Sequence, residues 1–190
     1  MGKDDQLASQ FASDPEDGTI VGKVLQTRVM AIGSFGWASL QAELESTFMT
    51  GGSVILQRMG YSYGRYLAKQ AKQRASKAKG TITPASPLDI LLEASRDQGW
   101  GRLSLSGGDF QVGTVNLVMK NCFFCLHEKK GASATCHFLV GLVVGVTDEV
   151  TGFSHKASEA RCMSKDDGLC EIRVERVTQQ ASELARQSIV

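Results

Sequence analysis

The strongest constraint in this sequence lies between residues 136 and 170, where several side chains able to bind a metal ion occur close together. Cys136 opens the stretch, and Glu159, Cys162 and Cys170 close it. Three thiolates and one carboxylate are enough to fill a tetrahedral zinc site, and a filled site is structural because catalysis needs an open position for water or substrate. The stretch therefore predicts a metal centre that stabilises the C-terminal half of the chain.

The spacing of these residues leaves a second interpretation open. Zinc ligands usually come in two close pairs, whereas Cys136 is distant in sequence from Glu159, Cys162 and Cys170. Free cysteine is also a common core residue, so the thiols could simply be buried. His137 and His155 lie in the same stretch and are reserve ligands, although a single histidine is more often a hydrogen-bonded structural residue.

The remaining two cysteines, Cys122 and Cys125, form a Cys-x-x-Cys pair. They follow a predicted strand, and positions three apart on a strand point to opposite faces, so the pair meets only if the strand breaks into a turn. No helix begins after the pair to lower a thiol pKa. We therefore expect ordinary buried thiols here rather than a redox or metal site.

Composition narrows the class of protein. The length of 190 residues suits one domain, and the net charge of +1 gives no general attraction to nucleic acid or membrane. The longest apolar stretch, Phe138 to Val146, is about half of the roughly 20 residues that a membrane helix needs. The polar N-terminus carries no secretory signal, and five cysteines are an odd number for a disulfide framework. We expect a cytoplasmic protein with no membrane span.

Residues 1 to 18 are polar and predict a flexible arm, leaving 19 to 190 as the domain. Apolar residues at three-to-four spacing predict helices, and alternating patterns predict strands. Residues 135 to 150 are apolar on nearly every side, which predicts a central helix but also allows a strand. The other predicted elements are an extended lead-in over 19 to 32, helices over Trp37 to Met49, Val54 to Ala78, Pro87 to Ala94 and Thr178 to Ser188, strands on both sides of a turn at Gly107 to Asp109, and a strand from Cys170.

Two helices carry glycines at the same four-residue spacing. Gly60 and Gly64 lie in one, and Gly141 and Gly145 in the other. Each glycine in a helix interior costs about 1 kcal/mol relative to alanine, so a compensating contact is needed. The two glycine faces could pack on each other or on a second subunit.

The end of the long helix is basic over Lys69 to Lys79, with no acidic residue among its charges. A solvated face that complements the helix dipole explains it. The alternative is a contact for an anionic partner, but no DNA-binding motif supports nucleic acid.

Together these motifs resemble a known family. Cys136-His-Phe-Leu-Val-Gly141, Glu159-x-x-Cys162 and Gly168-x-Cys170, with Met59-Gly60-Tyr61-x-x-Gly64 and Gly99-Trp100-Gly101, are similar to the 4-vinyl reductase domain family, which is related in fold to the TRAPP vesicle-tethering subunits. The resemblance covers roughly residues 30 to 176. It implies an α+β fold, a single TRAPP-like domain whose antiparallel sheet packs against helices, and a homodimer.

The resemblance also implies a site. In the phenol- and toluene-sensing activators of the family, a zinc ion bound by three cysteines and a glutamate sits beside a pocket for a small aromatic effector. Those ligands correspond to Cys136, Glu159, Cys162 and Cys170. The strand at Thr114 to Lys120 lacks the tryptophan that holds phenol in those sensors, so phenol specificity is not expected. The chain also stops where those activators continue, so direct promoter binding is not expected.

We therefore expect a zinc-containing, non-catalytic sensor or regulatory domain for a small hydrophobic or aromatic molecule, working through a regulatory protein partner. The alternatives are a TRAPP-like interaction scaffold and a tetrapyrrole vinyl reductase. No dinucleotide fingerprint or nucleophile–base pair supports the enzyme. Candidate pocket residues are aromatic, because such pockets are mostly apolar: Tyr63, Trp100, Phe110, Phe123 and Phe138.

Overall fold

The structure, a computed structural model, describes residues 11–14, 16, 19–22, 27–77, 86–110, 113–127 and 134–177. Its centre is an antiparallel four-stranded sheet. The strand order is β4 (Arg102–Asp109), β5 (Thr114–Lys120), β7 (Cys170–Arg176) and β6 (His155–Arg161). The predicted fold class, α+β with an antiparallel sheet packed against helices, is confirmed.

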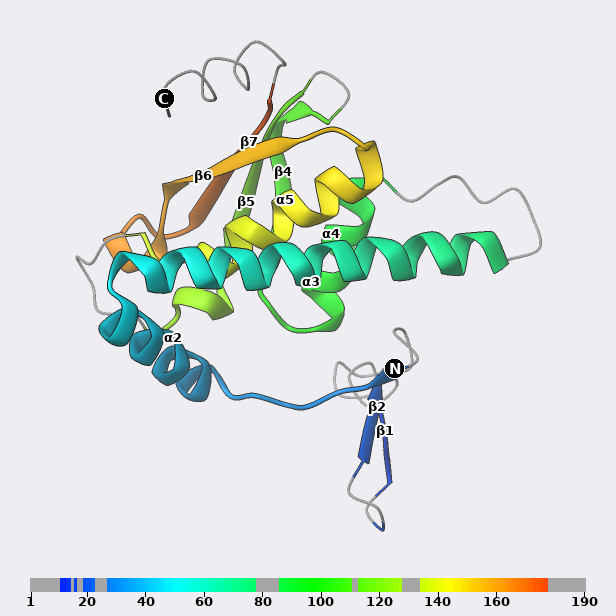
Figure 1. Cartoon of the computed structure of the whole chain (residues 1–190), viewed down its shortest axis with the longest axis horizontal. Coiled ribbons are helices and arrows are strands. Elements are labelled where there is room, and N and C mark those ends of the chain that lie inside the picture. Colours follow the sequence, from blue (N-terminus) through cyan, green and yellow to red (C-terminus); the bar gives the residue numbers. More distant parts are fainter. Residues whose placement is uncertain are drawn as a thin grey trace, which may run out of the picture.

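Helices form the rest of the body in two layers (Figure 1). The first layer, against the sheet, contains α5 (His137–Thr151) and α4 (Pro87–Asp97). The long α3 (Thr50–Lys77) crosses the outer side of α5, and α2 (Ser34–Phe48) joins its N-terminus at an angle. None of the helices in the described part of the chain is both long and apolar enough to cross a membrane.

The core lies between the sheet and α5. Alternation along β5 turns Val115, Leu117 and Met119 inward, and each is 1% exposed or less. Leu142 and Val143 of α5 are fully buried opposite them. Length separates a helix from a strand here, because a fifteen-residue apolar segment is long for a strand and suits a helix buried on most sides.

The glycine faces of α3 and α5 pack on each other. A Cβ atom added at Gly60 would lie 2.0 Å from the carbonyl oxygen of Phe138, and one added at Gly141 would lie 1.9 Å from that of Gln57. Gly64 and Gly145 make equally close backbone approaches. The interpretation that the two glycine faces pack on each other within one chain is therefore confirmed.

Several local predictions differ from the structure. The predicted turn at Gly107 to Asp109 is wrong, because β4 continues through Asp109. The strand has an irregularity between Leu105 and Gly107, and the Gly113 N–H donates to the Asp109 carbonyl. The edge strand β6 was not predicted because its sequence, HKASEAR, contains little apolar periodicity. The long helix α3 begins earlier than predicted, at Thr50 instead of Val54, and the Ser53 hydroxyl within it donates to the Thr50 carbonyl.

The outer helix α2 also differs in its buried face. The three-to-four spacing that predicts this helix puts Leu40 and Phe48 on its apolar face, yet they are 56% and 53% exposed. The buried residue is Gln41, whose Nε2 donates to the Thr135 carbonyl at 3.0 Å, next to Cys136. The Gln41 hydrogen bond therefore holds α2 against the body of the protein, together with the packing of half-buried Trp37 on the core.

A small antiparallel sheet precedes α2, formed by β1 (Phe11–Asp14), β2 (Thr19–Gly22) and β3 (Thr27–Arg28). Strand pairing therefore reaches into the segment predicted as an arm. The domain boundary at residue 19 stays a prediction, and the helix predicted from Thr178 lies outside the described residues.

Substitution of Gly141 tests the close helix packing. Gly141→Ala should destabilise the protein by about 1 to 3 kcal/mol, since the added methyl group forces two backbones apart. Gly36→Ala is the matched control in α2, where the nearest atom to an added Cβ is 3.5 Å away, and it should be neutral or stabilising by up to about 1 kcal/mol. Urea unfolding measures both, and equal stability of the two variants would contradict the packing.

Candidate metal centre

All five cysteines of the chain converge at one end of the sheet. Cys122 follows β5, Cys136 precedes α5, Cys162 follows β6 and Cys170 begins β7. Cys125 ends a 3-10 turn, η1 (Phe123–Cys125), that folds back after β5. Each thiol residue is at most 2% exposed, and none forms a disulfide. The sequence contributes these residues from distant segments, and the sheet ends bring them together.

The structure brings together the four predicted ligands Cys136, Glu159, Cys162 and Cys170, whose ligand atoms all lie within 4.8 Å of one another. The Sγ atoms of Cys136 and Cys170 are 3.5 Å apart, and those of Cys136 and Cys162 are 4.0 Å apart. Zn–S bonds of about 2.3 Å place sulfurs about 3.8 Å apart in a tetrahedron. The thiols thus already have the spacing of a zinc site.

Glu159 supplies the clearest sign of a missing partner. Its Oε2 accepts a hydrogen bond from the backbone N–H of Cys136 at 3.0 Å. Its Oε1 is buried and has no hydrogen-bond partner within the described residues. Since buried carboxylate oxygens are normally paired, a cation at the centre of the thiols fits this atom.

The metal-free site has strongly shifted acidities. Burial, followed by the neighbouring Cys162, raises the pKa of Glu159 to about 8. Hydrogen bonding with Cys125 and then Cys136 lowers the pKa of the Cys162 thiol to about 4, whereas the pKa of Cys136 is raised, first by hydrogen bonding with Cys122. The pKa values of Cys122 and Cys170 are lowered as well. Thiolate character is therefore shared by Cys122, Cys162 and Cys170, and the thiolate is the form that binds a metal.

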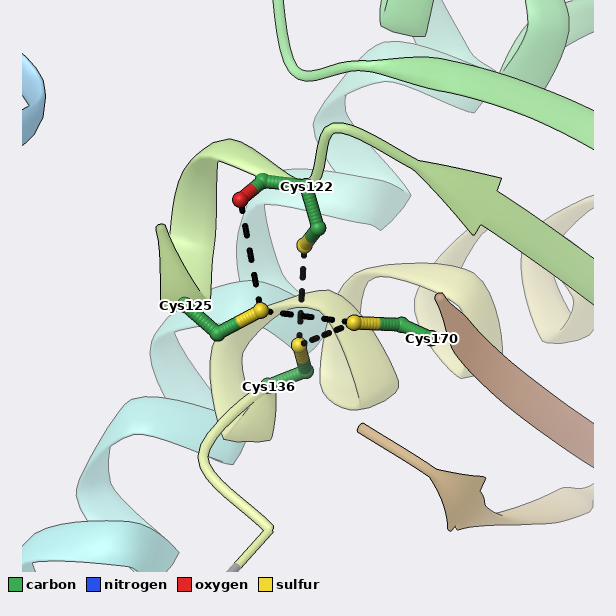
Figure 2. Close-up of side chains that lie close together, drawn as sticks. All are labelled: Cys122, Cys125, Cys136 and Cys170. Carbon is green, nitrogen blue, oxygen red and sulfur yellow. Dashed lines mark hydrogen bonds between the residues drawn. The ribbon is translucent and has the colours of Figure 1, made fainter. Parts of the chain in front are cut away.

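Cys122 and Cys125 also lie in the cluster. They were expected to be ordinary buried thiols, and the sequence did not predict that they lie at ligand distance from Cys136 and Cys170. Figure 2 shows them pointing toward Cys136 and Cys170. The Sγ distances are 3.5 Å from Cys122 to Cys136 and 3.3 Å from Cys125 to Cys170. The strand ends at Lys120 and η1 supplies the turn that the pair requires. These four cysteines form a second group with ligand spacing.

The two histidines held in reserve have other surroundings, and neither is in either group. His155 is 8% exposed, and its Nδ1 lies 2.9 Å from Asp148 Oδ1, which holds the ring as a structural residue. His137 is half-buried in the first turn of α5, and burial lowers its pKa.

Next to the thiols lies an aromatic cluster. Phe124, from the turn between Cys122 and Cys125, stacks on Phe138 with ring centroids 5.4 Å apart. Trp37 meets Phe138 edge-on at 5.1 Å, and Tyr63 meets Trp100 at 6.3 Å. Of the five predicted pocket residues, Tyr63, Trp100, Phe123 and Phe138 belong to this cluster, whereas half-buried Phe110 lies beyond β4 near its hairpin turn.

Beside the aromatic cluster, an open groove of about 890 Å³ runs along one side of α3 and reaches Phe138 of α5. Two predicted pocket residues, Tyr63 and Phe138, line it, while Trp100 and Phe123 do not. Sequence reasoning missed the other lining residues, although their spacing on one face of α3 could have revealed them. They are Ile55, Arg58, Met59, Ser62 and Tyr66.

Two residues of the basic end of α3 form ion pairs with neighbouring helices. Lys72 lies 3.7 Å from Glu149 of α5, and Arg74 lies 3.2 Å from Glu93 of α4. The predicted interpretation was a solvated face that complements the helix dipole, and the structure adds these two ion pairs to it. Lys79 lies outside the described residues.

Comparison with known proteins places the fold. No family model matches the sequence, and no curated protein matches it. Among solved structures, the phenol-responsive sensory domain of the transcription activator PoxR, with phenol, is 18% identical, has a TM-score of 0.71, and aligns over 95% of this chain and 93% of that chain.

Two further solved structures share the fold. A trafficking protein particle complex subunit 3 from Naegleria fowleri, covalently bound to palmitic acid, is 12% identical, with a TM-score of 0.55 over 76% of this chain and 93% of that chain. A vinyl-4-reductase family protein from Methanocaldococcus jannaschii is 14% identical, with a TM-score of 0.54 over 82% and 87%. The predicted resemblance is therefore confirmed at the level of the fold.

The raised pKa of Glu159 predicts a pH dependence of the metal-free protein. Between the ordinary pKa of 4.5 and the folded value of about 8, the unfolded chain loses a proton that the folded chain retains. The wild type should therefore lose stability relative to Glu159→Gln as the pH rises through this window, by at most about 1.4 kcal/mol per pH unit.

Urea unfolding with a chelator present measures this difference. With metal added the trend should reverse, because metal binding requires deprotonated ligands and strengthens as the pH rises. A stability difference between the two proteins that does not change with pH would contradict a buried, protonated Glu159.

Proposed function

We propose that this protein is a metal-stabilised, non-catalytic sensor domain that binds a small hydrophobic or aromatic molecule in the groove along α3. The observation that carries the proposal is Phe138, which lines the groove and lies two residues after Cys136. The metal ligands hold the N-terminus of α5, and this turn of α5 forms part of the groove. Similarity in fold to a phenol-responsive sensory domain supports the same class of function.

Zinc is the metal that we propose. Soft thiolate ligands favour zinc, copper(I) or iron–sulfur clusters over hard cations. Three thiolates and a carboxylate at tetrahedral spacing suit zinc, which lacks a preferred geometry of its own. Because protein groups fill all four positions, the zinc would organise the fold and leave no position for a substrate. This supports a binding domain over a vinyl reductase.

The groove suggests the kind of ligand. Its lining is apolar or aromatic except for Ser62 and Arg58, and Arg58 is its single charged residue. A molecule with an apolar body and a weakly acidic or anionic end would match this lining, since Arg donates readily to carboxylate and related groups. Met59, which is 47% exposed, presents a flexible apolar surface that adapts to different ligands.

Thermal unfolding with a panel of aromatic and aliphatic acids, phenols and neutral analogues tests ligand binding. A ligand at 100 times its Kd should stabilise the protein by about 2.7 kcal/mol. Trp37 and Trp100, the two tryptophans of the chain, lie in the aromatic cluster, so their fluorescence should report binding as well. A complete panel with no change in either signal would contradict the proposal.

Variants locate the binding site. Met59→Glu should abolish the ligand-induced stabilisation by placing a charge in the groove, whereas Gln73→Glu adds the same charge at an exposed position of α3 outside it. Arg58→Met should weaken acidic ligands while leaving neutral analogues nearly unaffected. Equal loss of binding in Met59→Glu and Gln73→Glu would contradict a site in this groove.

An interaction scaffold is a second candidate, favoured by exposed apolar side chains on α2 and the adjoining part of α3. Exposed apolar patches on a protein surface often mark sites of contact with other proteins. A homodimer through these helices, or a regulatory protein partner, would cover them. Light scattering of wild type and Phe48→Glu distinguishes a dimer from a monomer. The exposed residues are Phe35, Leu40, Phe48, Met49 and Val54. The cytoplasmic location stays a prediction.

A further inference from the structure

We propose that the cysteine cluster binds two metal ions, bridged by Cys136 and Cys170, rather than one. This inference rests on the proposed metal centre and extends it to Cys122 and Cys125. Two groups of four ligands exist, and they share two members. One group ends in Cys122 and Cys125, and the other ends in Glu159 and Cys162.

The geometry is that of two tetrahedra with a common edge. The shared sulfurs, Cys136 Sγ and Cys170 Sγ, are 3.5 Å apart. Cys122 and Cys125 each contact one of them, at 3.5 and 3.3 Å, while Cys162 lies 4.0 Å from Cys136. With Zn–S bonds of about 2.3 Å, cations on the two sides of a 3.5 Å edge lie about 3 Å apart, so the shared sulfurs leave room for one ion on each side.

Ligand satisfaction also favours two ions. A single ion in the all-cysteine group would leave Glu159 Oε1 buried without a partner. A single ion in the other group would leave the fully buried Cys122 and Cys125 as unused thiols at ligand distance. Two ions give each of the six side chains a metal bond, with Cys136 and Cys170 bonded to both.

Charge leads to the same result. Side chains lose their protons when they bind a metal, so in the fully loaded site five thiolates and one carboxylate carry six negative charges, and buried charges without compensation are costly. One divalent ion neutralises two of them, and a second ion halves the remainder. Arg161, the basic residue next to Cys162, donates to the Asp167 carbonyl at 2.7 Å instead of to the cluster. Bound cations are therefore the matching source of positive charge.

The surrounding backbone already orients the shared and terminal ligands. The N–H of Met163 donates to Cys170 Sγ at 3.5 Å, and Ser164 Oγ lies 2.9 Å from Cys162 Sγ. On the other side, the N–H of Phe123 donates to the Trp100 carbonyl at 2.8 Å and holds the turn that carries Cys122. Such contacts fix the direction of ligands before metal binds.

Metal stoichiometry tests the proposal. Elemental analysis of the intact protein loaded with zinc should give two ions per chain. Cys122→Ser/Cys125→Ser should retain one ion, and Glu159→Gln/Cys162→Ser should also retain one, since each pair serves a different ion. Circular dichroism of each double variant checks that it folds. Neither double variant changes Cys136, a ligand shared by both groups, so the test does not depend on whether Cys136→Ser folds.

Cadmium-113 NMR gives an independent measurement. The wild type should show two resonances, split by coupling through the shared thiolates, and each double variant should show one unsplit resonance. One ion per wild-type chain would overturn the two-ion proposal while leaving the metal centre of the proposed function intact. A wild type that binds no ion would overturn both.

Discussion

The N-terminus of α5 is the constraint on which the rest of the molecule depends. Cys136 precedes the helix, its thiol contacts other sulfurs of the cluster, and its N–H donates to Glu159. An acidic group at this position also interacts favourably with the positive end of the helix dipole. Five residues further on, Gly141 sets the backbone contact with α3. The first turn of α5 is thus fixed between the thiol cluster and the long helix.

This arrangement connects the metal centre to the groove by direct packing. Phe124 comes from the turn between Cys122 and Cys125, and it stacks on Phe138 of α5, which lines the groove. If the cluster binds metal as proposed, loss of that metal would release both segments that carry these rings. In the proposed function, metal binding therefore prepares the aromatic wall of the groove, and a ligand adds stability to a region that metal has already ordered. Metal binding energy at such a site is also folding energy.

Several features could be predicted because they depend on local pattern. Period predicted α3, the apolar character of residues 135 to 150 favoured a helix for α5 without excluding a strand, and alternation predicted β5 and β7. Pro87 correctly marked the start of α4, where Ser86 and Asp89 form a capping box. Local pattern was insufficient for β6, because this strand pairs through its backbone and carries few apolar side chains. It also failed for Gly108, which adopts a positive φ of 82° while paired with Val115 within β4 instead of in a turn.

The sequence alone determined the chemistry that is available: five thiols and a glutamate in a chain with enough apolar residues for one large core. It also indicated the α+β class and the four ligands from Cys136 to Cys170, through motifs that resemble a known family. Only the tertiary structure decided that Cys122 and Cys125 enter the same cluster, and that the aromatic side chains divide between a packed cluster and an open groove. The reason is that sheet pairing and helix packing join residues far apart in the chain, and the register of β5 against β7, with Met119 opposite Cys170, places the two cysteine segments side by side.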